Sequence, residues 1–370
     1  MYVNILDNYI FINYNYIFIM NKYNNLKKFI HEILFPFRGN WNLVWVLQRY
    51  IKSSLSGITW QKFKNAVLAI IEMTRGKAIV RSKPFVLRIE PTNICNLRCP
   101  RCSCGINTDP RRKGYMKLDD FKNILEENIR NAIILRLDGN GEPTLHPQIL
   151  EMIKVAKLFG YSVSMSTNLN TQICEDAKSI INSGLDRLII AIDGITQESY
   201  EKYRVGGKLV QVEKNLLNIL YTRKNLGSSR PYVEVQFLDW GYNHDEAPCL
   251  REKVRMWGVD KFEIIIPDWA VTNAKANSKK PRRCFWLWSV LTVDWETNYH
   301  SCTNAWTLPW PRKSFKDISS NNFWNSDLMV EARKYNISKL SKNIIEDHGC
   351  HCNSCSDMLV VDRPPSYVCE

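Results

Sequence analysis

The sequence predicts an α/β fold built on a parallel sheet, and three observations support this prediction. Six short apolar runs rich in β-branched residues occur at 85–90, 132–137, 161–166, 187–192, 232–237 and 261–266. Amphipathic stretches such as LDDFKNILEENI, QILEMIKVAKLFG and CEDAKSIINSG separate most of them, and this alternation is typical of parallel α/β domains. The runs are nearly continuous in apolar residues, which favours a sheet covered on both faces. Periodicity alone does not distinguish an open doubly wound sheet from a barrel.

Length and composition predict one large domain and a smaller one, since 370 residues with 45% hydrophobic content can bury a full core. The formal net charge of +13 is compatible with an anionic partner. A solvated surface, reflecting biased Lys, Asn and Ile usage, is the preferred interpretation. The densest basic run, at 275–283, lies beside a cysteine and predicts an interdomain linker, so no nucleic-acid partner is expected.

The N-terminal part predicts helices and no transmembrane segment. The apolar stretch 1–20 is interrupted by Asn and Asp, is too short to span a bilayer, and lacks the features of a signal peptide. One hypothesis is that Met20 is the true start, so that about the first 19 residues are not native. Apolar residues at helical spacing then recur at 41–51 and 60–73, with Gly76 after the second stretch. We expect a helical extension over 1–83 that packs on the main domain, rather than an anchor on a membrane surface.

The cysteines indicate metal binding. Cys95, Cys99 and Cys102 follow the first apolar run with C-x3-C-x2-C spacing. Of the twelve cysteines, four lie at 95–104 and six lie from 284 to the C-terminus. Without a secretory signal, this pattern favours metal ligation in a reducing, cytoplasmic compartment over disulfides. Three thiolates can hold three irons of a cubane and leave the fourth open, whereas structural zinc takes four ligands, usually in paired C-x2-C units. Three unrelated thiols are the alternative.

Polar motifs follow three later runs. Gly-Glu-Pro stands at 141–143, Ser-Thr-Asn at 166–168, and an Asp-Gly…Arg-x-Gly-Gly segment at 193–207. Each alone is a weak signal, because ordinary βα-loop turns hold such residues. In this order, downstream of the cysteine triad, they resemble the radical S-adenosylmethionine (SAM) superfamily.

The resemblance implies an open, partial (β/α)6 TIM-like barrel over 84–274, with the cofactor at the C-terminal ends of the strands. It implies that Cys95, Cys99 and Cys102 hold a 4Fe–4S cluster whose open iron is chelated by the amino and carboxylate groups of SAM. The SAM contacts that it implies are Gly141, Glu142, Pro143, Ser166, Asn168, Asp193 and Arg204. Glu142 would take part in receiving the ammonium, and Arg204 would grip the carboxylate.

Two residues depart from the family pattern. Arg101 stands before the third cysteine, where an aromatic residue usually packs on the adenine of SAM. Its flat guanidinium is expected to stack there instead. Ala191 replaces the serine that usually begins the segment after the fourth strand. Cys104, just past the triad, is interpreted as a spare thiol.

The C-terminal cysteines predict a second metal centre. Residues 284–302 are interpreted as a hairpin around DWETN, flanked by Cys284 and Cys302, and Cys352-x2-Cys355 follows about fifty residues later. These four thiolates resemble the twitch domain, a shortened SPASM extension that holds one auxiliary 4Fe–4S cluster, and predict a small α+β domain over 275–370. Structural zinc is the alternative. Cys350 and Cys369 could supply or replace a ligand.

The resemblance implies that an electron from a reductase or a flavodoxin- or ferredoxin-type donor cleaves SAM to a 5′-deoxyadenosyl radical. That radical would abstract a hydrogen atom from the substrate. Dehydrogenation of a sugar-like small molecule is preferred, since a single auxiliary cluster resembles the aminocyclitol dehydrogenase of the superfamily. Modification of a peptide or protein comes second, and RNA modification, which rests only on the basic charge, comes third. An electron carrier is disfavoured, because it needs no open iron.

Overall fold

The computed structural model describes residues 58–266, 284–302 and 313–338. All of them belong to one compact unit, residues 53–370. The predicted helix at 41–51 and the cysteines at 350, 352, 355 and 369 lie outside the described residues.

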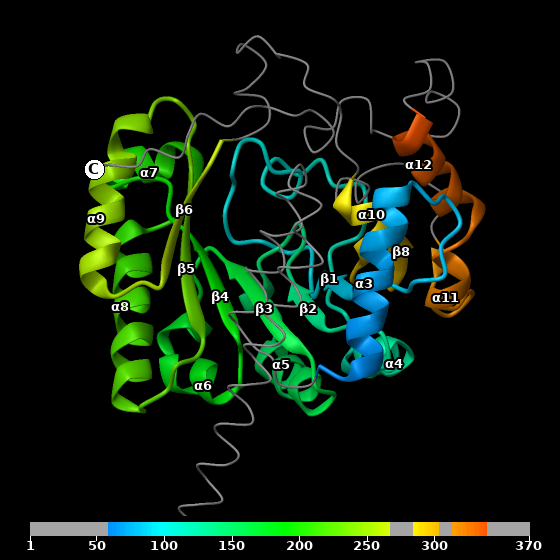
Figure 1. The fold of residues 1–370 in the computed structure, drawn as a ribbon. Helices are drawn as coiled ribbons and strands as arrows, with labels where there is room; N and C mark the ends of the chain where they lie inside the picture. The colour runs from blue at the N-terminus through cyan, green and yellow to red at the C-terminus, as the bar shows by residue number, and fades with distance from the viewer. Residues whose placement is uncertain (1–57, 267–283, 303–312, 339–370) are drawn as a thin grey trace, which may run out of the picture. The chain divides into compact units, whose positions relative to one another are not determined.

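A nine-stranded sheet in the order β6-β5-β4-β3-β2-β1-β7-β8-β9 forms the core of this unit (Figure 1). The strands are β1 (Val86–Ile89), β2 (Ile134–Leu137), β3 (Ser162–Thr167), β4 (Arg187–Ala191), β5 (Tyr232–Leu238), β6 (Lys261–Ile265), β7 (Val290–Val293), β8 (Asn298–His300) and β9 (Lys313–Ser314). Strands β1 to β6 pair in parallel, each with its neighbour in sequence. All six predicted strands and the α/β class are therefore confirmed. Closure into a partial barrel stays a prediction.

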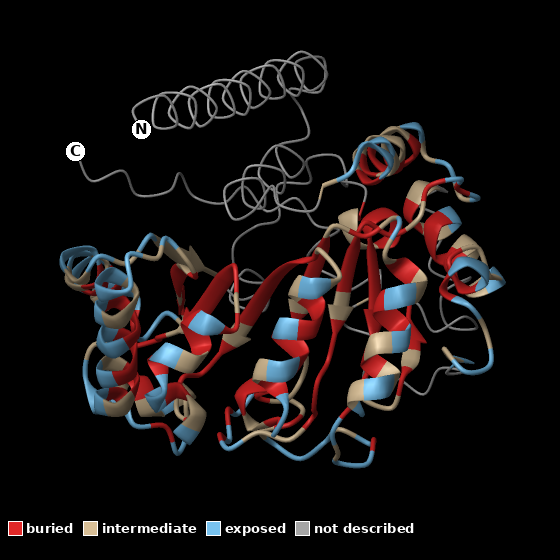
Figure 2. Cartoon of the chain, turned by 90° about the horizontal axis from the view of Figure 1, so that it is seen from below, coloured by how far each residue is buried: buried red, intermediate tan, exposed pale blue. Residues whose placement is uncertain are grey.

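Helices follow most of the parallel strands and turn their buried sides towards the sheet (Figure 2). They are α3 (Trp60–Arg75), α4 (Leu118–Asn128), α5 (Ile149–Leu158), α6 (Ala177–Asn182), α7 (Gln197–Tyr203), α8 (Leu209–Asn225), α9 (Ala247–Trp257), α10 (Phe285–Ser289), α11 (Ser320–Phe323) and α12 (Asp327–Ser338). Helix α3 ends at Gly76, whose φ of 66° is left-handed. The Asn65 side chain on this helix donates to the carbonyls of Lys83 and Asn131. Helix α3 therefore packs on the main domain.

The two faces of the sheet differ in polarity. Apolar side chains such as Leu87, Leu135 and Leu188 alternate along the strands and are fully buried in the hydrophobic core. The residues between them include a row of side chains in lateral register across four strands: Arg88, Arg136, Ser164 and Arg187. Such charges need partners: Asp138 pairs with Arg88 and Arg136, and Glu234 pairs with Arg187. Most positions on both faces of β3 and β4 are buried, which agrees with the expected sheet covered on both faces, although this face carries charged residues.

The segment 284–302 differs from its prediction as one long hairpin. Residues Phe285–Ser289 form helix α10, because Leu287 and Trp288 are buried and the Trp288 indole donates to the Lys77 carbonyl at 2.8 Å. The hairpin is shorter and consists of β7 and β8. Strand β7 pairs in parallel with β1, so the hairpin extends the main sheet. The predicted domain boundary near residue 275 stays a prediction.

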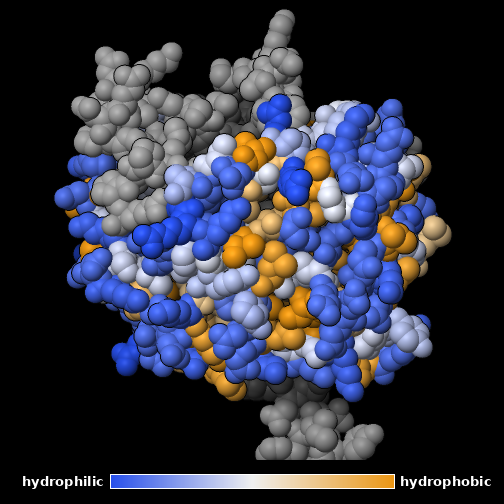
Figure 3. Space-filling model, turned by 180° about the vertical axis from the view of Figure 1, so that it is seen from behind, coloured by the Kyte–Doolittle hydropathy of each residue, from blue (hydrophilic) through white to orange (hydrophobic). Residues whose placement is uncertain are grey.

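One face of the molecule has a mixed surface. Figure 3 shows one face on which hydrophilic side chains surround smaller apolar areas. Of the helices in the described ranges, none combines the length and the apolar character that crossing a bilayer requires.

We predict that Asp186→Ala lowers the free energy of unfolding by about 3 kcal/mol, because it leaves buried polar groups without their partner. The fully buried Asp186 carboxylate accepts from the Val163 amide (2.8 Å), the Lys157 ammonium (2.5 Å) and the Arg230 guanidinium (2.6 Å). Urea denaturation measures the change. Glu252→Ala, which removes an exposed carboxylate on α9, is the control. Equal stability of the two variants would contradict this role.

Candidate cluster and cofactor site

The cysteine triad lies in the loop between β1 and α4, here called the cluster loop and spanning residues 90–115. Cys99 is buried, whereas Cys95 and Cys102 are partly exposed. A turn joins them, since the Cys102 amide donates to the Cys99 carbonyl at 3.1 Å. Burial raises the pKa of the Cys99 thiol to about 11; the charge of Arg204 opposes this shift, and the charges of Cys102 and Cys95 add to it. Cys99 and Cys102 thus belong to one turn of the cluster loop.

The triad supplies three thiols, the type of ligand that holds iron–sulfur clusters. Across the residues that the structure describes, no three Cys, His, Asp or Glu side chains converge as ligands of one ion would. In a cubane each thiolate binds a different iron, so its ligands need not converge. A bound metal deprotonates a coordinating thiol, which would offset the burial that disfavours the thiolate here. The donor set therefore fits a 4Fe–4S cluster.

The Gly-Glu-Pro turn after β2 lies directly against the cluster loop. A Cβ atom on Gly141 would come within 2.3 Å of the Thr92 carbonyl oxygen and 2.7 Å of the Ile94 carbonyl oxygen, so only glycine fits. The Glu142 amide donates to the Ile94 carbonyl at 2.8 Å. The Cys102 thiol lies 3.8 Å from the Asn140 carbonyl oxygen. The structure therefore brings residues 141–143 and the cysteines together.

The Glu142 carboxylate is buried and is held by protein donors. It accepts from the Thr144 amide (3.1 Å), the Thr144 hydroxyl (2.6 Å), the Thr167 hydroxyl (2.7 Å) and the Asn168 amide (2.8 Å). Burial raises its pKa, and these donors oppose the shift. Glu142 thus joins the turn after β2 to the end of β3. Its predicted contact with an ammonium stays a prediction.

The end of β3 also meets the cluster loop. The side-chain Nδ2 of Asn168 donates to the Asn96 side-chain oxygen at 2.9 Å and lies 4.0 Å from the Cys95 sulfur. Ser166 is partly exposed. Asn168 is therefore adjacent to a predicted cluster ligand.

Asp193 and Arg204, which follow β4, form an ion pair at the same edge of the sheet. The Asp193 carboxylate is fully buried and accepts from Arg204 Nε at 2.6 Å and from the Leu238 amide at 2.8 Å. The Arg98 amide donates to the Val205 carbonyl at 2.9 Å, which joins this loop to the cluster loop. The structure thus gives Arg204 a protein partner through Nε. Its predicted grip on a carboxylate stays a prediction.

An aromatic pair near the cluster loop was missed from the sequence. The Tyr203 and Trp240 rings have centroids 3.9 Å apart. Burial is the main cause of the raised pKa of Tyr203; the charge of Arg204 opposes the shift, and the charges of Cys99 and Cys102 add to it. Arg101, expected to supply a stacking surface, is exposed. The signal that could have been used is the position of Tyr203 beside Arg204.

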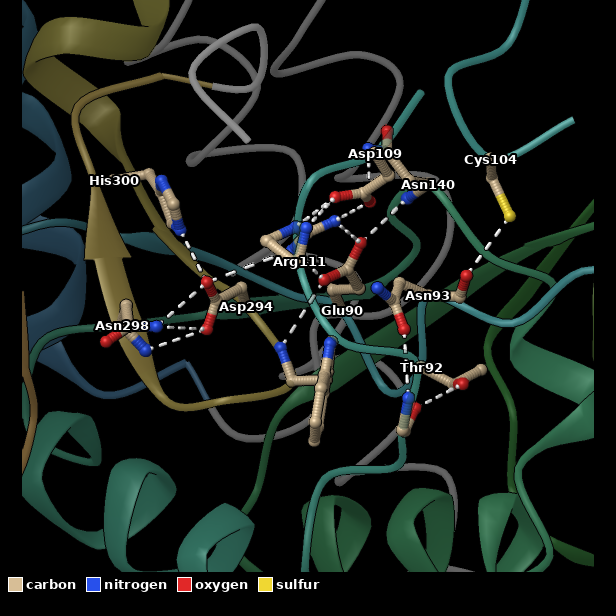
Figure 4. Close-up of polar contacts among 12 residues, drawn as sticks. Glu90, Thr92, Asn93, Cys104, Asp109, Arg111, Asn140, Asp294, Asn298 and His300 are labelled. Atoms are coloured by element: carbon tan, nitrogen blue, oxygen red, sulfur yellow. Dashed lines mark hydrogen bonds and ion pairs between the residues drawn. The ribbon is translucent and has the colours of Figure 1, made fainter. Parts of the chain in front are cut away.

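A second group missed from the sequence surrounds Arg111 (Figure 4). Its guanidinium pairs with Glu90 at the end of β1 and with Asp109 in the cluster loop. Burial raises the pKa of Glu90, which Arg111 opposes. A glutamate directly after a buried strand was the signal for an internal ion pair.

Two of the four predicted ligands of the second metal centre, Cys284 and Cys302, lie within the described residues. The Cys284 amide donates to the Asn336 side chain at 3.1 Å, and Cys302 follows β8 and is partly exposed. Cys352 and Cys355 lie outside the described residues, so the four-ligand set stays a prediction. Cys104 is buried and contacts the Asn93 carbonyl oxygen at 3.1 Å. Its hydrogen bond with Cys95 is the largest contribution to the raised pKa of Cys95.

Residues 89–221 match the Radical SAM superfamily. The chain is 27% identical over 181 residues to the tungsten-containing aldehyde ferredoxin oxidoreductase cofactor-modifying protein of Pyrococcus furiosus, covering 48% of this chain and 50% of that protein. It is 23% identical over 292 residues to the PqqA peptide cyclase of Rhizobium meliloti, covering 68% and 75%. The chain thus spans about half the length of the Pyrococcus relative. The superfamily match supports an enzyme and implies a 4Fe–4S cluster and SAM as cofactors.

Among solved structures, the chain is similar to SuiB of Streptococcus suis bound to S-adenosylmethionine. The TM-score is 0.52 at 12% sequence identity, with 74% of this chain and 72% of that chain covered. This likeness concerns the fold alone.

We predict that the stability of the apoprotein falls between about pH 7 and pH 5, partly through His146. The ring is neutral, because His146 Nε2 donates to the Met116 carbonyl at 2.8 Å and Nδ1 accepts from the Gln148 amide at 3.1 Å. Burial lowers the pKa of His146. The contribution of His146 to the free energy of unfolding is therefore complete above the unfolded-state pKa. It is lost as the pH falls towards the lower folded-state pKa. Urea denaturation of His146→Gln should show a free energy of unfolding that depends less on pH than that of the wild type. An equal dependence on pH in the two proteins would contradict this role of His146.

Proposed function

We propose that this chain, whose residues 89–221 form a radical SAM domain, cleaves SAM reductively and abstracts a hydrogen atom from its substrate. When bound, the cluster and SAM supply the electron transfer and the 5′-deoxyadenosyl radical. The observation that carries the proposal is the meeting of three segments with the cluster loop at one edge of the sheet. The Gly141 turn packs on residues 92–94, Asn168 adjoins Cys95, and Val205, next to Arg204, bonds to Arg98.

Each residue would have a separate role. Cys95, Cys99 and Cys102 would hold the cluster. The turn at 141–143 would present backbone carbonyls to the ammonium of SAM, with Glu142 fixing the turn from behind. Arg204, oriented by Asp193 through Nε, would direct its remaining nitrogens towards the carboxylate of SAM. Ser166 and Asn168 would contact the ribose or the carboxylate, and Arg101 would lie beside the adenine.

The polar face of the sheet favours a polar small molecule as the substrate, and we propose net dehydrogenation of a sugar-like compound. The row formed by Arg88, Arg136, Ser164 and Arg187 supplies donors and ion pairs on the face opposite the hydrophobic core. A substrate with many hydroxyl groups would exchange hydrogen bonds with such a face. The second candidate is modification of a peptide, favoured by the similarity to the PqqA peptide cyclase.

A second 4Fe–4S cluster would be held by Cys284, Cys302, Cys352 and Cys355. We propose the domain limits 1–83, 84–274 and 275–370, with this cluster in the last domain, and a flavodoxin- or ferredoxin-type protein or a reductase as the electron donor. A reducing cytoplasm suits thiolate ligands.

We predict that the anaerobically reconstituted protein holds about eight irons, four for each cubane, and forms 5′-deoxyadenosine from SAM and dithionite. Cys99→Ala should lose about half of the iron and all deoxyadenosine formation. Cys249→Ala is the matched control, because Cys249 is an exposed cysteine on α9. Deoxyadenosine formation by Cys99→Ala at the wild-type rate would refute the proposal.

Cys302→Ala tests the second centre separately. We expect about four irons to remain and deoxyadenosine still to form, because the first cluster keeps its ligands. Metal analysis that finds one zinc ion per chain in the wild type, lost in this variant, would replace the auxiliary cluster with structural zinc.

A further inference from the structure

Arg111 is a buried cation inside the cluster loop. Its side chain has no solvent exposure. Nη1 and Nη2 donate to the two oxygens of Glu90 at 2.5 and 3.0 Å, while Nε and Nη2 donate to Asp109 at 2.9 and 2.6 Å (Figure 4). Such forked pairing fixes the orientation of both carboxylates.

Both partners of Arg111 contact Asn140, the residue before the Gly-Glu-Pro turn. The Asn140 amide donates to Glu90 Oε1 at 3.0 Å, and its side chain donates to Asp109 Oδ2 at 3.3 Å. The Asn140 carbonyl in turn faces the Cys102 thiol. Arg111 therefore connects the cluster loop to the turn after β2 through two separate carboxylates.

The base of the cluster loop is closed independently. The Thr92 hydroxyl donates to the Gly114 carbonyl at 2.6 Å, and the Gly114 amide donates to the Asn93 side chain at 3.0 Å. The Asn93 side chain donates to the Arg112 carbonyl at 2.7 Å. Loss of Arg111 would therefore loosen the interior of the loop while its two ends stay joined.

The β7–β8 hairpin supports the same group from the other side. Asp294 Oδ2 lies 3.8 Å from Arg111 Nη1 and is held by His300 and Asn298. The Trp295 amide approaches Glu90 Oε2 at 3.4 Å. The Trp295 ring covers Gly114, where a Cβ atom would lie 2.4 Å from the ring.

We propose that Arg111 is a positioning residue that holds the cluster loop and the Asn140–Glu142 turn in the arrangement that binds SAM, with the β7–β8 hairpin as its support. This inference rests on the proposed function, because it takes the loop as the cluster site and the turn as the ammonium site. Arginine suits the position, since its planar fork serves two carboxylates at once. The point charge of lysine does not.

The first test uses the apoprotein and hydrogen exchange followed by mass spectrometry. Arg111→Gln should speed exchange in peptides covering 93–110 and 139–142 by about tenfold or more, because the loss of a charge-assisted pair lowers the local opening free energy. Arg223→Gln is the matched control. Arg223 is a largely buried arginine that also pairs with a carboxylate, Asp260, but it lies near the C-terminal end of α8.

The second test follows SAM binding to the reconstituted protein by the change in the electron paramagnetic resonance spectrum of the reduced cluster. Arg111→Gln should keep the wild-type iron content and bind SAM at least about tenfold more weakly. Arg111→Lys should resemble Arg111→Gln more than the wild type. Should Arg111→Gln fail to fold, Asp109→Asn provides a milder change with the same readouts and an expected loss of about threefold.

Unchanged exchange in Arg111→Gln, or full rescue by Arg111→Lys, would overturn the inference. Faster exchange with unaltered SAM affinity would also overturn it, because the loop would then move without consequence for SAM. Failure of the wild type itself to bind SAM would instead reject the proposed function. The exchange result would in that case still show whether Arg111 holds the loop.

Discussion

The close approach of the Gly141 turn to the backbone of residues 92–94 is the contact on which the site depends. Strands β1 and β2 are parallel neighbours, so the loops that follow them leave the sheet at the same edge. Only a residue without Cβ allows the two backbones to meet at this distance. The Glu142 amide then bonds to Ile94, and Cys102 comes to face Asn140. The cysteines, the turn and the end of β3 thus share one region.

Buried charges stabilise this arrangement, because each has a partner within the protein. Glu90 has Arg111, Asp193 has Arg204, and Glu142 has four hydrogen-bond donors. Removing one member of such a pair leaves an uncompensated charge in a region of low dielectric constant. The loops are therefore coupled to the sheet and to one another. This coupling suits a reaction in which a reactive radical must form next to the substrate and away from water.

The sequence was sufficient for the six parallel strands and insufficient for helix α10 and for the contacts between elements. The six parallel strands were predictable because β-branched runs and amphipathic stretches alternate clearly. Helix α10 was missed because its bulky residues satisfy both helical and extended patterns. The hydrogen bond from the Trp288 indole to the Lys77 carbonyl favours the helix. The partners of Arg111 are 2, 21 and 183 residues away in the chain. Glu90 directly after a buried strand signals an ion pair, but one sequence does not show which cation meets it. Tyr203 and Trp240 meet for the same reason.

Three cysteines that bind three irons of a cubane would leave the fourth iron open to SAM. Electron–nuclear double resonance of the reduced protein, loaded with SAM labelled with ¹⁵N at its amino group, tests whether SAM binds that iron. We expect a hyperfine coupling from the amino nitrogen to the cluster, because that nitrogen would bind the open iron. The absence of this coupling in protein with a full iron content and bound SAM would show that SAM does not bind an open iron.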